Sequence, residues 1–146
     1  MKKTLIYIWA GLYIAAGHIY VRTFRLFGWY RFVMKIETVG TPLLAHVYTP
    51  VFEKCPKWLY NAWHKGFGGH TVGNVIVVTR IHDTELINHE LHHVTQYARL
   101  GLLFLPIYLC GYLASWAAGE HAYAMNPLEV AARRSVGDVI DRKKKR

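Results

Sequence analysis

The sequence predicts an α+β fold that is mainly helical, and three observations lead to this prediction. Two uncharged apolar runs, residues 4–21 and 100–119, are long enough to form helices. A β-branched run at residues 71–79 is typical of a strand. Finally, Asp83 and Asn126 each precede a segment with helical character, in the position of an N-cap.

Length and composition restrict the class of protein. The 146 residues fit one domain, and the balance of 53% hydrophobic to 18% charged residues excludes a disordered chain. Lys and Arg number 18 against 9 Asp and Glu, so the net charge of +9 favours an anionic partner. The basic residues form no nucleic-acid-binding motif, and we expect no nucleic-acid partner. Cys55 and Cys110 are too few for a disulfide framework and lack the spacing of a cysteine zinc site.

Residues 1–21 are predicted to be an apolar, membrane-associated N-terminal segment. Basic residues are more numerous after this segment than before it, and Trp and Tyr are frequent around it. Both features favour a membrane-associated chain whose body lies on the cytoplasmic side. The small residues 15–17 also fit a signal-peptidase site, so signal cleavage and export stay open. An uncleaved anchor, a helix in the membrane interface and a buried core helix are further alternatives.

The rest of the chain is predicted to form one domain, residues 22–140, followed by a basic tail at 141–146. Prolines and glycines in residues 22–68 indicate short elements and loops. The run at 71–79 predicts a short strand or hairpin, with Gly73 as a possible bulge. A helix is expected from Asp83 or Thr84 to about Leu100.

The central helix contains the motif H-E-x-x-H. His89 and His93 lie four residues apart, so both imidazoles project from one helical face and can bind one metal ion. Glu90 is then placed to act on a water at that ion. His92 lies near the same face, and we expect it to contact the ligands, to face the substrate or to be exposed.

A third ligand is expected downstream of the motif. Glu129 is the first choice because it lies in the first turn of a separate helix that begins with Asn126 and Pro127. Glu120 and His121 are the alternatives. A carboxylate near a helix N-terminus is also common without any metal, because it is favoured by the helix dipole.

Ligation by Glu129 restricts the second apolar run. If residues 100–119 crossed a bilayer, Glu129 would end about 30 Å from His93, and nine residues could not bring it back to the motif. Gly101, Pro106 and Gly111 interrupt the run as well. We therefore predict a bent helix or hairpin that packs under the site or lies in the membrane interface.

These motifs, taken in order, resemble the zincin metallopeptidases of the gluzincin type. Residues 68–134 resemble more closely a group of small bacterial proteins regarded as zinc metallopeptidases. In that group a strand, an H-E-x-x-H helix, an apolar Pro-containing segment and Asn-Pro-x-Glu-x-x-Ala follow one another. The resemblance implies a small zincin-like domain with His89, His93 and Glu129 as Zn²⁺ ligands and Glu90 as the general base.

The expected activity is peptide-bond hydrolysis of a peptide or protein substrate, by Glu90-assisted attack of a zinc-bound water. Tyr97, His92, His121 and Tyr123 are candidates for stabilising the oxyanion. The 69–78 segment could pair with an extended substrate at an exposed strand edge. The rival hypothesis is a non-catalytic, membrane-associated binding or structural protein with a structural metal or none.

Overall fold

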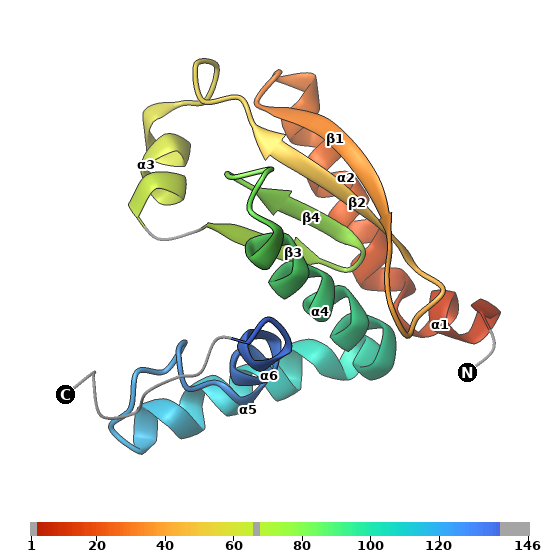
Figure 1. Cartoon of the computed structure of the whole chain (residues 1–146), viewed down its shortest axis with the longest axis vertical. Coiled ribbons are helices and arrows are strands. Elements are labelled where there is room, and N and C mark those ends of the chain that lie inside the picture. The colour runs from red at the N-terminus through yellow and green to blue at the C-terminus, as the bar shows by residue number, and fades with distance from the viewer. Residues whose placement is uncertain (1–2, 66–67, 138–146) are drawn as a thin grey trace.

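A mixed sheet of four strands forms the centre of the fold (Figure 1). The structure is a computed structural model that describes residues 3–65 and 68–137. The strand order is β1 (Tyr30–Glu37), β2 (Leu44–Pro50), β4 (Val75–Val78) and β3 (Gly69–Val72). β2 and β4 pair in parallel, and the two outer pairs are antiparallel. The predicted α+β class is confirmed, and β3 lies at an edge of the sheet.

Helices cover both faces of the sheet (Figure 1). Side chains of β4 alternate between the faces, so Ile76 and Val78 pack with residues of α4 (Thr84–Leu100). Val75 and Val77 pack in a second core with α2 (Gly11–Leu26) and α3 (Lys57–Lys65). Because all four side chains of β4 are buried, this strand reads as one continuous β-branched run in the sequence.

Residues 22–68 contain more regular structure than the sequence predicted. The two longest strands, β1 and β2, lie there together with the last part of α2 and all described residues of α3. The register of the β1–β2 pair shifts between Phe32 and Met34, which marks an irregularity in the ladder. β1 shows no clear alternation of buried and exposed residues, because much of this edge strand is exposed or half-buried on both faces.

The hairpin of β3 and β4 corresponds to the predicted 71–79 segment. Gly73 and Asn74 form its two-residue turn, and Val72 pairs with Val75. Gly73 has a φ of +63°, so it serves the turn and not the bulge suggested from the sequence.

The first apolar run forms two helices, α1 (Lys3–Trp9) and α2, which are separated at Ala10. α2 packs against the sheet, where Val21 is fully buried. α1 contacts the C-terminal half of the molecule, because the indole Nε1 of Trp9 donates to the carbonyl of Arg99 at 3.2 Å. Both helices therefore pack against the folded domain: α1 contacts α4, and α2 contacts the sheet. The predicted tail at residues 141–146 lies outside the described residues.

The second apolar run is bent, as predicted. α4 ends at Leu100, a 3₁₀ turn spans Gly101–Leu103, and α5 (Phe104–Ala117) leaves in a new direction (Figure 1). Within the described residues, one helical stretch, 84–117, is long and apolar enough in composition to cross a membrane, and this turn divides it. α6 (Pro127–Ser135) then returns to pack against α4.

Candidate metal centre

Two histidines of the metal centre come from one face of α4. The helix is capped by Asp83, whose carboxylate accepts from the backbone N–H of Leu86 at 2.9 Å. The four-residue spacing brings the Nε2 atoms of His89 and His93 to 3.2 Å from each other. Two imidazole nitrogens so close together, inside the protein, would compete for one proton or share one cation.

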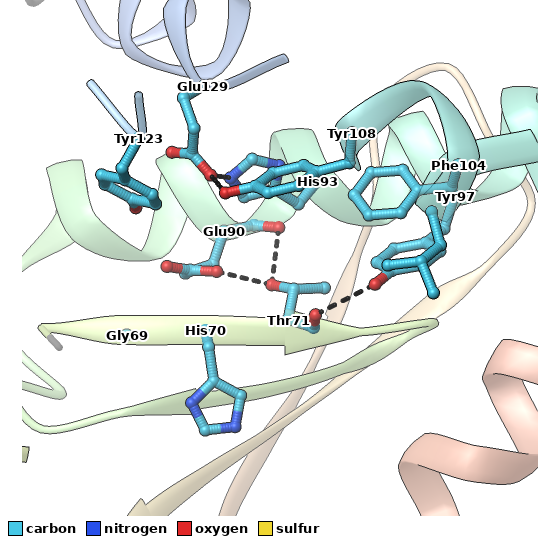
Figure 2. A pocket seen from close by; sticks show the side chains of 11 residues that line it. Gly69, His70, Thr71, Glu90, His93, Tyr97, Phe104, Tyr108, Tyr123 and Glu129 are labelled. Atoms are coloured by element: carbon cyan, nitrogen blue, oxygen red, sulfur yellow. Dashed lines mark hydrogen bonds and ion pairs between the residues drawn. The ribbon is translucent and has the colours of Figure 1, made fainter. Parts of the chain in front are cut away.

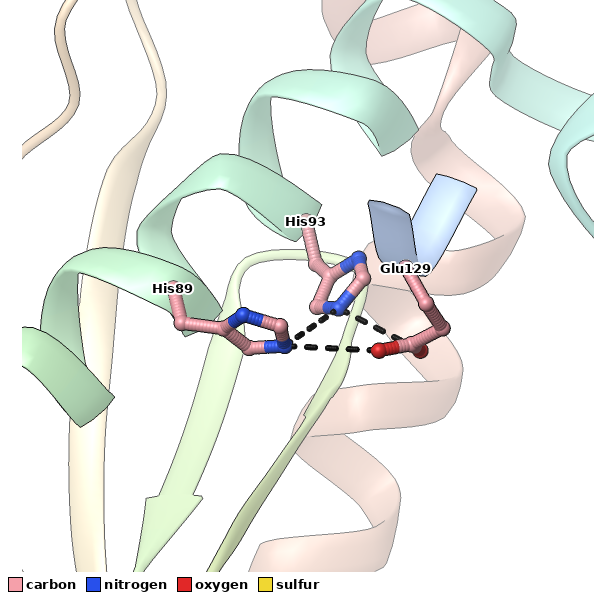
Figure 3. Close-up of side chains that lie close together, drawn as sticks. All are labelled: His89, His93 and Glu129. Atoms are coloured by element: carbon pink, nitrogen blue, oxygen red, sulfur yellow. Dashed lines mark hydrogen bonds and ion pairs between the residues drawn. The ribbon is translucent and has the colours of Figure 1, made fainter. Parts of the chain in front are cut away.

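Glu129 completes the cluster from α6 (Figure 3). Its Oε2 lies 3.4 Å from Nε2 of His89, and its Oε1 lies 3.5 Å from Nε2 of His93. The Asn126 side chain begins α6 by accepting from the backbone N–H of Leu128 at 3.0 Å. This cap places Glu129 in the first turn, directed at α4.

The three donors have the spacing that a metal ion requires. A tetrahedral zinc ion with bonds of about 2.0–2.1 Å separates its ligand atoms by about 3.3 Å. The separations of 3.2, 3.4 and 3.5 Å match this value. Among the described residues, the buried Oε2 of Glu129 receives no hydrogen bond, as expected for an atom whose partner is a cation. The group His89, His93 and Glu129 therefore fits a metal ion.

Neighbouring polar groups hold two of the three donors in place. Nδ1 of His93 lies 2.8 Å from Oε1 of Gln96, whose Nε2 donates to the carbonyl of Leu128 at 2.9 Å. A proton on Nδ1 leaves Nε2 of His93 unprotonated for ligation. The hydroxyl of Tyr108 in α5 donates to Oε1 of Glu129 at 2.9 Å.

Electrostatic effects differ between the two buried ligands. Burial by itself would raise the pKa of Glu129, but the neighbouring imidazoles outweigh it and hold the pKa well below its ordinary value. Burial would likewise lower the pKa of His93, but the carboxylates of Glu129 and Glu90 outweigh it and raise the pKa. The site therefore favours an ionised Glu129 beside positive charge.

Glu90 lies beside the cluster and contacts the sheet edge (Figure 2). The hydroxyl of Thr71 in β3 donates to Oε2 of Glu90 at 2.6 Å. Only 3% of the Glu90 surface is exposed, and this burial raises the pKa of its carboxyl despite the opposing effect of His93. A buried carboxylate with a raised pKa is suited to accept a proton.

A cavity of about 220 Å³ opens at this cluster. Three kinds of group line it: the backbone of β3, the two carboxylates, and aromatic side chains of α4, α5 and the loop before α6. Its described lining residues are Gly69, His70, Thr71, Glu90, His93, Tyr97, Phe104, Leu105, Tyr108, Tyr123 and Glu129. The His70 ring itself lies on the opposite side of β3 from Glu90 (Figure 2).

The other candidates from the sequence lie elsewhere. Glu120 and His121 are exposed, and His92 is half-buried without lining this cavity. The sequence did not predict three contacts at the site. Thr71 contacts Glu90, Gln96 contacts His93, and Tyr108 contacts Glu129. Gln96 lies one helical turn after His93, and that spacing could have indicated it, whereas Thr71 and Tyr108 depend on tertiary packing.

Comparisons with known protein families, curated proteins and solved structures find no match to this chain. The fold and the site by themselves define an α+β protein with a candidate metal centre of two His and one Glu. A buried fourth residue, Glu90, lies beside that centre and borders the cavity.

Proposed function

We propose that the protein is a zinc-dependent metallopeptidase of the zincin type, with His89, His93 and Glu129 as ligands. The observation that carries the proposal is the position of Glu90. It is buried beside the three donors, yet borders a cavity next to them. A purely structural site would be closed and would not need this carboxylate. Two His and one Glu are also a donor set of catalytic zinc.

Glu90 acts as the general base in this proposal. Bound zinc would supply a Lewis acid that activates water and polarises the substrate carbonyl. Thr71 occupies Oε2 of Glu90, so we assign proton uptake from the attacking water to Oε1. Glu90 then returns this proton to the leaving amine, which completes hydrolysis of the peptide bond.

An extended peptide could bind by pairing with β3. Val72 faces Val75 across the turn, and Gly68 accepts from the backbone N–H of Thr79 at 3.0 Å. By alternation, the backbone groups of Gly69 and Thr71 point away from β4 toward the free edge. A substrate strand added there would run past Glu90.

Tyr123 is our candidate for the oxyanion donor. Of the four side chains considered from the sequence, only Tyr97 and Tyr123 line the cavity among the described residues. The hydroxyl of Tyr97 donates to the carbonyl of Thr71 at 3.5 Å. Tyr123 is the more exposed of the two, and its side chain hydrogen-bonds to Glu129, so this residue lies between the cavity and the metal-binding group.

The test separates metal binding from hydrolysis. We expect stoichiometric zinc in the wild type and its loss in His93→Ala and Glu129→Ala, measured by elemental analysis of desalted protein. Glu90→Gln should retain zinc but lose hydrolysis of a quenched-fluorescent peptide library by a factor on the order of 10² to 10⁴.

Glu85→Gln is the matched control, because Glu85 is exposed on the same helix and does not line the cavity. It should retain both zinc and activity. A folded wild type without zinc, or full activity in Glu90→Gln, would contradict the proposal. Zinc without any hydrolysis would favour the non-catalytic alternative.

We also propose that the protein is membrane-associated, with the site on the cytoplasmic side. The apolar composition of stretch 84–117 and the basic residues that follow residues 1–21 support this assignment.

A further inference from the structure

The outward side of α5 is apolar over most of its circumference. At 100° per residue, the residues directed away from the protein span an arc of roughly 220°. Within the arc, the large apolar side chains are between 40% and 69% exposed: Leu105, Ile107, Leu109, Tyr112, Leu113 and Trp116. A helix that presents such an arc to water would be unfavourable, so this face requires a covering partner.

The same apolar face continues onto the N-terminal helix. Leu102 and Leu103 of the 3₁₀ turn are about half exposed, and α1 contacts this turn. Leu5 and Ile8 extend the exposed apolar surface on α1. We call the surface of α1, the 3₁₀ turn and α5 the apolar face. α1 and α5 lie away from most of the sheet (Figure 1).

The net charge of the chain and the lack of acidic residues in the apolar face favour an anionic bilayer as the partner. The first acidic residue in the chain is Glu37, and none occurs between Glu90 and Glu120, so α1, the 3₁₀ turn and α5 contain no acid. The whole chain carries +9. Exposed Trp9, Tyr112 and Trp116 are side chains that prefer the boundary of a membrane. A single protein partner would cover a narrower stripe than an arc of roughly 220°.

The contacts of α5 favour a position along such a membrane and not across it. Asn126 donates to the carbonyl of Tyr108 at 2.9 Å, which ties the middle of α5 to the start of α6. α6 carries Glu129, Arg133 and Arg134. Insertion of α5 across the hydrocarbon would take these charged groups with it, at a high cost in free energy.

The cavity of the metal centre opens beside the apolar face. Phe104, Leu105 and Tyr108 of α5 line it, and Leu105 is 56% exposed, so this residue belongs to both the cavity wall and the apolar face. A peptide held at the bilayer surface would reach the site past an apolar wall.

We propose that the apolar face docks on an anionic bilayer and that the substrate is an apolar peptide segment held at the membrane surface. The substrate assignment rests on the proposed peptidase function, whereas the docking does not. The two parts are therefore tested by separate measurements on the same preparations.

Docking is measured by flotation with vesicles of phosphatidylcholine, alone or in an equimolar mixture with phosphatidylglycerol. We expect the full chain to bind the anionic vesicles, and Leu109→Glu/Leu113→Glu to reduce binding by roughly tenfold or more. Both leucines lie outside the cavity lining. The matched control, Leu26→Glu/Phe27→Glu, changes two exposed apolar residues at the end of α2, opposite α5 (Figure 1), and should bind like the wild type.

The docking proposal would be overturned if the wild type and both double variants bound the vesicles equally, or if the wild type did not bind them. A wild-type dimer that Leu109→Glu/Leu113→Glu dissociates, without vesicle binding, would instead assign the apolar face to a second copy. Circular dichroism and zinc content establish that the variants are folded.

The substrate class is tested with one cleavable peptide, free and with an acyl anchor, in the presence of vesicles. We expect the wild type to cleave the anchored peptide at least about tenfold faster, and Leu109→Glu/Leu113→Glu to lose this preference while cleaving the free peptide normally. Equal rates in the wild type would overturn the substrate assignment. Vesicle binding without cleavage of either peptide would contradict the peptidase function and still support the docking.

Discussion

Gln96 connects two parts of the metal centre. Its carbonyl accepts from Nδ1 of His93, and its amide donates to the backbone of α6 at Leu128, next to Glu129. One side chain thus orients a ligand and fixes the helix that carries another. Such supporting groups set the tautomer and the direction of a histidine ligand.

Gln96→Leu should weaken zinc binding by about 10- to 100-fold, because it leaves Nδ1–H of His93 without an acceptor. Competition with a chromophoric chelator measures the affinity. Gln96→Glu preserves an acceptor for Nδ1–H of His93, so it should bind zinc more tightly than Gln96→Leu. If Gln96→Leu bound zinc like the wild type, Gln96 would have no role in positioning His93.

His70 makes stability dependent on pH. Burial lowers its pKa to about 4, and its ring stacks on Trp63 with centroids 4.9 Å apart. The unfolded chain, with a pKa near 6.5, binds more protons below that pH, so acid favours unfolding. We expect His70 to remove on the order of 2 to 3 kcal/mol from the free energy of unfolding between about pH 6.5 and 4.

Chemical denaturation as a function of pH tests this, with chelator present so that metal binding does not contribute. His70→Phe keeps an aromatic ring on Trp63 and should lose less stability on acidification than the wild type. Parallel curves for the two proteins would show that His70 does not titrate in this way.

The turn after α4 decides where α5 goes. Gly101 has a φ of +50°, and a Cβ added there would lie 2.3 Å from Nε1 of Trp9. The glycine thus permits the change of direction and leaves room for α1. Without this turn, α4 and α5 would continue as one rod, and α6 could not return to His93.

Gly101→Ala should reduce the free energy of unfolding by about 2 kcal/mol or more, through backbone strain and the contact with Trp9. Gly119→Ala is the control, because Gly119 also has a positive φ but no atom within 4 Å of an added Cβ. Denaturant unfolding compares the two variants. An equal loss in both would mean that the Trp9 contact adds nothing.

A metal at this centre would join distant parts of the molecule. His89 and His93 belong to α4, while Glu129 arrives on α6 after α5 has extended away. Gln96 and Tyr108 hold His93 and Glu129 from outside the cluster, and the three donors face one another within it. Metal binding should therefore stabilise the whole fold, since the unfolded chain does not hold the three donors together.

Zinc at about 100 times its Kd should raise Tm by about 5 to 10 °C. Calorimetry with and without zinc measures the shift. His93→Ala should show little or none, and an equal shift in this variant would place the stabilising ion elsewhere.

The sequence by itself determined the local features of this protein. Helical spacing joined His89 to His93, and side-chain caps at Asp83 and Asn126 predicted where α4 and α6 begin, because these signals act within one or two turns. A break in the second apolar run was predicted from Gly101, Pro106 and Gly111 and from the requirement that Glu129 reach the motif. The break occurs at Gly101, whereas α5 continues through Pro106 and Gly111.

Only the tertiary structure decided which distant groups meet. Glu129 lies 36 residues from His93 in the sequence, and Thr71 reaches Glu90 from a strand on the other side of the motif. β1 and β2 were not predicted, because β1 is largely exposed or half-buried and β2 is buried on both faces, so neither shows a regular alternation. The physical reason is that spacing and caps act locally, whereas convergence depends on how the sheet and helices pack.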